Sequence, residues 1–201
     1  VAGIILDGLG LGTDGTVWGG ELLLGDYLSF ERIAHLTPVP LVGGDRAQRE
    51  PWRNALFRLD EARLGDVADD LFPDQPRQIL RQAAASEVNA VASSSAGRLF
   101  DAVAALLGIH PDNQSFEGEA AMALEALATI DAHPYPFGPD LSPVPMIKAL
   151  MQDMRGGVPI PDIAGRFHAG LAEAFARPAR ELIVSGRAGG VALSGGGSHP
   201  P

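Results

Sequence analysis

The sequence contains no cysteine, and Lys148 is the only lysine among its 15 basic residues. The first absence excludes a disulfide framework, a thiol nucleophile and a cysteine zinc site, and it is compatible with a cytoplasmic protein, which we expect. The second removes the P-loop and Schiff-base mechanisms, because both depend on lysine. Asp and Glu number 25, so the formal charge is −10. Such a chain lacks the basic face of a nucleic-acid binder, and we expect no nucleic acid as a partner.

Long apolar runs are also missing, because none approaches the roughly 18 residues that a membrane span requires. We therefore expect no membrane association. Hydrophobic residues make up 46% of the 201 positions, which is enough for a buried core. The 25 glycines occur in clusters, which suggests backbone that lies close to another group. Apolar runs stand at both ends of the sequence, and this favours a piece of a larger protein.

The order of apolar and turn-forming segments predicts an α/β fold. Strands are expected at 1–6, 16–24, 30–36 and 190–193, the first ending at Asp7, and a loop is expected at 38–44. Helices are expected at 45–64, 76–85, from the serines at 93–95 to Gly108, at 117–130, at 146–154 and around 163–178. The chain then divides into a β-rich segment 1–44, a helical segment 45–189, a terminal strand and loop 190–196, and a tail 197–201.

The glycine-rich segment after the first strand allows more than one interpretation. The run from Gly10 to Gly15 fits the G-x-G-x-x-G pattern of dinucleotide-binding folds, but that pattern requires a helix to follow. A β-rich stretch with two adjacent glycines follows instead, which disfavours it. In a strand–turn–strand arrangement, backbone N–H groups could face a phosphate while the Asp7 and Asp14 carboxylates hold a divalent cation. An ordinary glycine-rich hairpin is the alternative, and spacing alone does not separate the two.

The expected helix after the three serines places Gly97 and Asp101 four residues apart, on one face. Leu99 and Val103 belong to the apolar stripe elsewhere, so we expect the Asp101 carboxylate to be accessible to sugar hydroxyls. On that basis Asp101→Asn should weaken nucleotide binding about ten- to a hundredfold and change stability by no more than about 0.5 kcal/mol. A capped amphipathic helix with a surface aspartate remains the alternative.

Other polar clusters have simple structural explanations. The acidic residues at 117 and 119 suit the dipole of the expected helix 117–130, and the arginines at 46–53 suit helical salt bridges. His168 lies in the last long helix, where packing explains it better than catalysis. The five histidines form no metal-binding pair, and no serine nucleophile elbow or triad is present.

Six segments occur in an order that resembles the HypF family of carbamoyltransferases, which act in hydrogenase maturation. The segments are GIILDGLGLGTDGTVWGGELL, FERIAHLTPVPLVGGDRAQREPWRNAL, SSSAGRLFDAVAALLG, SFEGEAAMALEALA, RFHAGLA and VALSGG. The resemblance runs from residue 1 to 196 and is to the catalytic C-terminal region, which is similar to the threonylcarbamoyl-transferase domain of tRNA modification. It implies a partial domain of the actin/Hsp70 type, a ribonuclease H-like lobe.

The resemblance also implies an activity. Carbamoyl phosphate and ATP would give carbamoyl-adenylate, and the carbamoyl group would pass to the C-terminal cysteine of the partner HypE. This is a step toward the cyanide ligands of nickel–iron hydrogenase. The alternatives are a non-catalytic module that docks a partner, or a related O-carbamoyltransferase. Replacing Asp7 and Asp101 would separate enzyme from module, since an enzyme would lose transfer and keep its partner.

Matching residue by residue to the family implies roles for particular positions. Asp7 corresponds to a ligand of a divalent metal, whether iron, zinc or magnesium. The phosphate loop would be formed by Gly8, Gly10, Gly12, Asp14 and Gly15. The ribose contact would be formed by Gly97, Asp101 and Gly118. A second nucleotide loop would be formed by Ser194, Gly195 and Gly196. This sequence lacks the family's metal-binding histidine pair and the Val-Phe-Gln-Asn that follows the last loop. We therefore expect no tightly bound metal and no activity from the chain alone.

Overall fold

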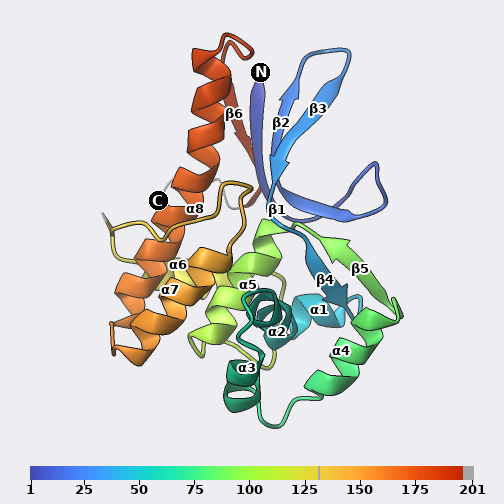
Figure 1. Ribbon diagram of the computed structural model, residues 1–201, viewed down its shortest axis with the longest axis vertical. Helices are drawn as coiled ribbons and strands as arrows, with labels where there is room; N and C mark the ends of the chain where they lie inside the picture. Colours follow the sequence, from blue (N-terminus) through green and yellow to red (C-terminus); the bar gives the residue numbers. More distant parts are fainter. Residues whose placement is uncertain (131, 197–201) are drawn as a thin grey trace.

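The computed structural model describes residues 1–130 and 132–196, so the expected tail at 197–201 lies outside the described residues. The described strands form one mixed six-stranded sheet in the order β4-β5-β2-β1-β6, with β3 paired to β2. Figure 1 shows the sheet beside a group of helices, with β6 next to β1. The strands are β1 (Ala2–Leu11), β2 (Val17–Gly25), β3 (Phe30–His35), β4 (Val39–Val42), β5 (Ala90–Ser93) and β6 (Val191–Ser194).

The first strand is longer than expected, and the prediction that it ends at Asp7 is wrong. β1 pairs antiparallel with β2 up to Leu6, and pairing resumes at Gly10 opposite Trp18 after a register shift. The three residues between Leu6 and Gly10 therefore form a bulge in the strand, and a bulge redirects side chains without ending the ladder. Because β2 follows the glycine turn directly, the structure contains no helix at the position that a dinucleotide fingerprint requires.

The expected loop at 38–44 is also wrong, because it contains β4. This strand pairs antiparallel with β5, which the sequence analysis did not predict. Pro40 is accommodated because β4 lies at one edge of the sheet, where one side of the backbone needs no donor. The segment 45–189 is thus helical except for β5.

The expected helix at 45–64 is divided into two by Glu50 and Pro51, since proline favours the first turn of a new helix. A short helix at 65–71 was not predicted. The other expected helices and the last strand are confirmed, with boundaries moved by a few residues, and the final helix continues through Pro178. The helices are α1 (Arg46–Arg49), α2 (Trp52–Glu61), α3 (Gly65–Leu71), α4 (Arg77–Ala85), α5 (Ala96–Leu106), α6 (Glu119–Leu127), α7 (Val144–Arg155) and α8 (Ile160–Val184).

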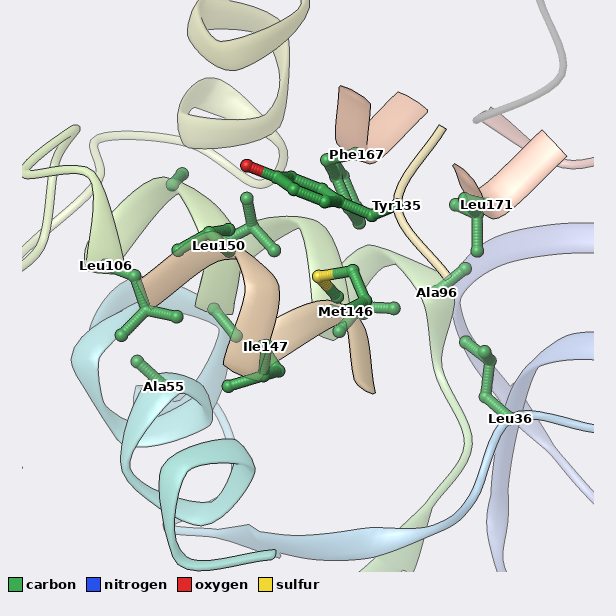
Figure 2. Packing of buried hydrophobic residues seen from close by; sticks show 14 of the residues in the cluster. Leu36, Ala55, Ala96, Leu106, Tyr135, Met146, Ile147, Leu150, Phe167 and Leu171 are labelled. Carbon is green, nitrogen blue, oxygen red and sulfur yellow. The ribbon is translucent and has the colours of Figure 1, made fainter. Parts of the chain in front are cut away.

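The core is organised around α5, which contacts α2, α6 and β1. Figure 2 shows side chains of α2, α5, α7 and α8 meeting in one apolar cluster, among them Leu106, Ile147, Leu150 and Phe167. Burial of this many aliphatic and aromatic groups is what holds the helices against the sheet. Among the described residues, no helix combines the length and the apolar character that crossing a membrane would take.

Candidate functional site

The bulge in β1 meets two other segments that the sequence analysis singled out. At the N-terminus of α5, the Ser95 hydroxyl accepts a hydrogen bond from Arg98 N–H at 3.1 Å and donates to the Asp7 carbonyl at 3.2 Å. A Cβ on Gly97 would lie 2.8 Å from Gly8 Cα, and one on Gly195 would lie 2.1 Å from the Leu6 carbonyl oxygen. Only glycine allows backbones to approach so closely. The structure therefore brings Asp7, Gly8, Gly97 and Gly195 together, and we call these four residues the bulge site.

Asp7 presents the carboxylate of the bulge site to solvent. Its side chain is exposed, and one oxygen, Oδ1, accepts the Gly8 N–H at 2.7 Å. A stable transition-metal site usually has about four ligands. Within residues 1–130 and 132–196 there is no group of three His, Asp or Glu side chains that could hold a metal ion. The described residues therefore offer one exposed carboxylate to a metal and do not by themselves fit a complete metal centre.

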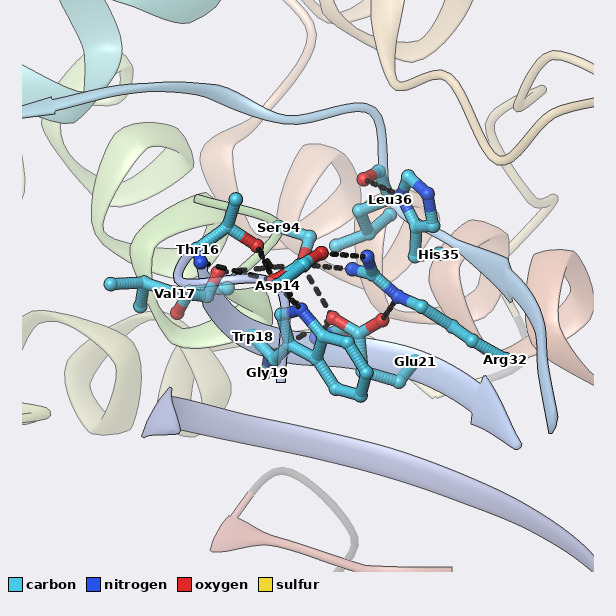
Figure 3. Close-up of polar contacts among 12 residues, drawn as sticks. Asp14, Thr16, Val17, Trp18, Gly19, Glu21, Arg32, His35, Leu36 and Ser94 are labelled. Atoms are coloured by element: carbon cyan, nitrogen blue, oxygen red, sulfur yellow. Dashed lines mark hydrogen bonds and ion pairs between the residues drawn. The ribbon is translucent and has the colours of Figure 1, made fainter. Parts of the chain in front are cut away.

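The glycine turn between β1 and β2 is held by Asp14 rather than left open. Asp14 Oδ1 accepts hydrogen bonds from Thr16 N, Thr16 Oγ1 and Trp18 Nε1 at 3.0, 2.7 and 3.0 Å. The bonds from Thr16 are the main reason that the pKa of Asp14 falls to about 2. Figure 3 shows these contacts converging on the Asp14 carboxylate. In this structure the carboxylate closes the turn, with Gly15 at a positive φ of 78°.

Arg32 links this turn to the sheet and to the start of α5. Its Nε donates to the buried Glu21 carboxylate at 2.6 Å, its Nη1 to Asp14 at 3.2 Å and its Nη2 to Ser94 Oγ at 3.1 Å. The guanidinium also lies 4.1 Å from the centre of the Trp18 ring. All three nitrogens of Arg32 therefore have partners. We call Asp14, Glu21, Arg32 and Ser94 the closed arginine network (Figure 3).

The expectation that Asp101 is accessible is wrong, because the structure buries it completely. Its Oδ2 lies 3.1 Å from Arg98 Nε, and its Oδ1 accepts a bond from Gln114 Nε2 at 3.3 Å. Desolvation raises the pKa of Asp101 to about 6, although the nearby Arg98 opposes the rise. The physical reason is tertiary: α5 is surrounded by α2, α6 and the segment before α6, so its polar face is covered too. A change to Asn at this position therefore acts on a buried ion pair and not on an accessible surface carboxylate.

The contact between Arg98 and Glu117 was not predicted from the sequence. Arg98 is 5% exposed, and its Nη2 lies 3.4 Å from Glu117 Oε1. The same carboxylate oxygen stands 2.7 Å from the position that a Cβ of Gly8 would take. We call Arg98, Asp101, Gln114 and Glu117 the open arginine network. The i,i+3 spacing of Arg98 and Asp101 was a signal for the first ion pair, whereas nothing local indicated the second.

The profile for "Carbamoyltransferase, Kae1-like Domain, second subdomain" matches residues 3–199 of this chain. The chain belongs to the HypF family. The carbamoyltransferase HypF of Rhodobacter capsulatus is 61% identical over 98% of this chain, and HypF of Synechocystis is 33% identical over 98%. This chain covers 26% and 28% of those two proteins, so it spans about a quarter of the relatives it matches.

Solved HypF structures agree with the fold described above. A full-length HypF in a phosphate- and nucleotide-bound form superposes with a TM-score of 0.89 at 34% identity, over 98% of this chain and 32% of that one. HypF of T. kodakarensis gives a TM-score of 0.82 at 32% identity, over 98% and 28%. The HypF resemblance and the actin/Hsp70-like fold class are thereby confirmed.

The remaining residues predicted from the HypF resemblance lie around the bulge site without joining it. Gly10 pairs with Trp18, and Gly12 lies against the ring of the same tryptophan. Gly118 caps α6 with a φ of 87°, a backbone conformation that favours glycine. Ser194 pairs with Ile5 at the end of β6, just before Gly195 and Gly196. Their roles in nucleotide binding stay predictions.

Proposed function

We propose that this chain forms the nucleotide-binding part of a HypF carbamoyltransferase. In the proposed reaction, water first releases phosphate from carbamoyl phosphate to leave carbamate, and a carbamate oxygen then attacks the α-phosphorus of ATP to give carbamoyl-adenylate and pyrophosphate. A thiolate on the acceptor then attacks the carbamoyl carbon, a C–S bond forms, and the C–O bond to the adenylate phosphate breaks. The products are a thiocarbamate and AMP, and the thiol proton is released to solvent or to a base.

The convergence of Asp7, Gly8, Gly97 and Gly195 carries this proposal. Close backbone approach at a helix N-terminus suits a phosphate, because N–H groups and the helix dipole both favour an anion there. The start of α5 lies against the bulge, and the loop after β6 closes on the same residues. A relative that was solved with phosphate and nucleotide supports this assignment. A divalent metal would take Asp7 as one of its ligands.

The acceptor thiol lies outside this chain, which contains no cysteine. We propose a HypE-like protein with a C-terminal cysteine as that partner, on the strength of the family membership. The bulge site faces solvent at Asp7, so an extended C-terminal peptide could approach it.

The experiment replaces Asp7 by Asn in a complete carbamoyltransferase that carries this segment. We expect carbamoyl transfer to a cysteine-terminated acceptor to fall at least about tenfold, because the substitution removes the negative charge of the exposed carboxylate in the bulge site. Asp70→Asn is the matched control, since Asp70 is an exposed aspartate on α3. Transfer is measured as thiocarbamate formed and AMP released.

Binding is measured separately on the chain itself. Millimolar ATP with magnesium should raise the midpoint of thermal unfolding, because a ligand that binds only the folded state stabilises it. Equal activity of the Asp7→Asn and Asp70→Asn proteins, together with no effect of ATP on unfolding, would overturn the proposed function. Loss of partner binding with intact chemistry would instead favour a docking module.

A further inference from the structure

Arg98 is a buried cation whose hydrogen-bonding capacity is only partly used. It lies in the first turn of α5 and is 5% exposed. Its Nε lies 3.1 Å from Asp101 Oδ2 in an ion pair without an aligned hydrogen bond, and its Nη1 has no hydrogen-bond partner within 1–130 and 132–196. Taking a guanidinium out of water without filling its donors costs free energy, and proteins rarely do so without a reason.

The two carboxylates that neutralise Arg98 differ in mobility. Asp101 is buried and is fixed by Gln114, whose amide also bonds the backbone of Gln48 and of Ala120. Glu117 has a side chain that is 55% exposed, and its single contact with Arg98 is a long one at 3.4 Å. Asp101 is therefore a permanent counter-ion, whereas little holds Glu117 in place.

Glu117 also fills the space beside Gly8 in the bulge site. Its Oε1 lies 2.7 Å from the position of a Cβ on Gly8, and Arg98 Nη2 lies 3.9 Å from the same point. The carboxylate thus occupies, beside Gly8, the position that an anion bound to both Arg98 and the α5 N-terminus would take.

We propose that Arg98 binds a phosphoryl group of the nucleotide and that Glu117 is a displaceable counter-ion which blocks this position until the phosphoryl group arrives. This inference rests on the proposed function, and it adds a residue pair that controls access to the site. A phosphoryl group carries more charge than a carboxylate and accepts paired bonds from a guanidinium, so it competes well for Arg98. The dipole of α5 favours the same exchange.

The structure offers a place for the displaced carboxylate. Glu117 borders a cavity of about 200 Å³ that lies between α1 and the segment 115–117. Asp45 and Arg49 border the same cavity, so a Glu117 side chain that turns into it would have both an aspartate and an arginine as charged neighbours.

The experiment measures binding of inorganic phosphate and of ATP to this chain by titration calorimetry. Glu117→Gln removes the blocking charge and should lower the dissociation constants of phosphate and of ATP about three- to tenfold. This increase in affinity should become smaller at high salt. Glu125→Gln is the matched control, because Glu125 is an exposed glutamate on α6 and its change alters the net charge equally. Circular dichroism of all three proteins checks that the fold is unchanged.

The outcomes separate this inference from the proposed function. Binding by the original chain with equal affinity in the Glu117→Gln and Glu125→Gln proteins would overturn the inference alone. Weaker binding after Glu117→Gln would also overturn it, because Glu117 would then be a direct contact. Binding that is detected only in the Glu117→Gln protein would support the inference, because it would mean that Glu117 keeps phosphate and ATP away from Arg98 in the original chain. Absence of phosphate and ATP binding in all three proteins would overturn both proposals.

Discussion

Two arginines of this chain each lie between two carboxylates, and the two arrangements differ in how completely the guanidinium is satisfied. In the closed network, Arg32 bonds Asp14, Glu21 and Ser94 and stacks on Trp18. In the open network, Arg98 pairs with Asp101 through Nε and with Glu117 through Nη2, yet its Nη1 makes no hydrogen bond to a described residue.

The difference separates a structural ion network from one that is prepared for a ligand. A fully bonded arginine holds the segments that it joins, here the glycine turn, β3 and the residue before Ser95. An arginine with free donors, buried beside a glycine-lined bulge, gains when an anion arrives. The two networks meet at the start of α5, since Ser94 belongs to the first and Ser95 caps the helix of the second.

The largest expected effect comes from breaking the closed network. Arg32→Ala leaves Glu21 buried at 1% exposure without its cation, and removal of one partner of a buried pair costs about 3–5 kcal/mol. We expect a loss of this size in urea denaturation. Arg187→Ala is the control, because Arg187 and Glu31 form an exposed pair that contributes less than about 1 kcal/mol. Similar losses in both variants would show that the network does not hold the hairpin.

A smaller loss is expected from the open network. Asp101→Asn leaves Arg98 with Glu117 as its only close carboxylate, and at pH 7 we expect a cost of no more than about 1 kcal/mol, because burial already disfavours the ionised carboxylate that the amide replaces. The loss stays below that of Arg32→Ala, because the neutral amide avoids the desolvation that a buried carboxylate suffers. Urea denaturation of the two variants under one set of conditions gives the comparison.

The pH dependence gives an independent check on Asp101. Its pKa is raised from 3.8 to about 6 by burial, so the folded state binds more protons than the unfolded state between these values. The contribution of Asp101 to stability is therefore full below about pH 4 and is lost as the pH rises through 6. Unfolding free energies at pH 4.5 and 6.5 should show this slope in the original chain and not in Asp101→Asn. An equal slope in both would mean that Asp101 is not the titrating group.

The smallest effect belongs to Asp14, which is exposed. Its pKa is lowered to about 2, chiefly by the bonds from Thr16, so its contribution is present above the unfolded value of 3.8 and is lost as the pH falls through 2. Fluorescence of Trp18 should report this loss, because its indole N–H bonds Asp14. Recording it in a Trp52→Phe background isolates the signal. A Trp18 spectrum that is constant from pH 5 to pH 2 would contradict this.

Local patterns predicted a good part of the architecture. The period of apolar residues indicated α5 and α8, and the glycine turn between two apolar runs indicated the pairing of β1 with β2. Predictions failed where pairing partners are distant. β4 is only four residues long and contains Pro40, so its strand character depends on β5, about 50 residues later in the chain.

The sequence by itself determined the family and the fold class, because these depend on motifs and on local conformational preference. Only the tertiary structure decided that Asp101 is buried and that Glu117 stands beside Gly8 against Arg98. The physical reason is that desolvation and ion pairing depend on what packs around a side chain. That environment comes from residues far away in the sequence.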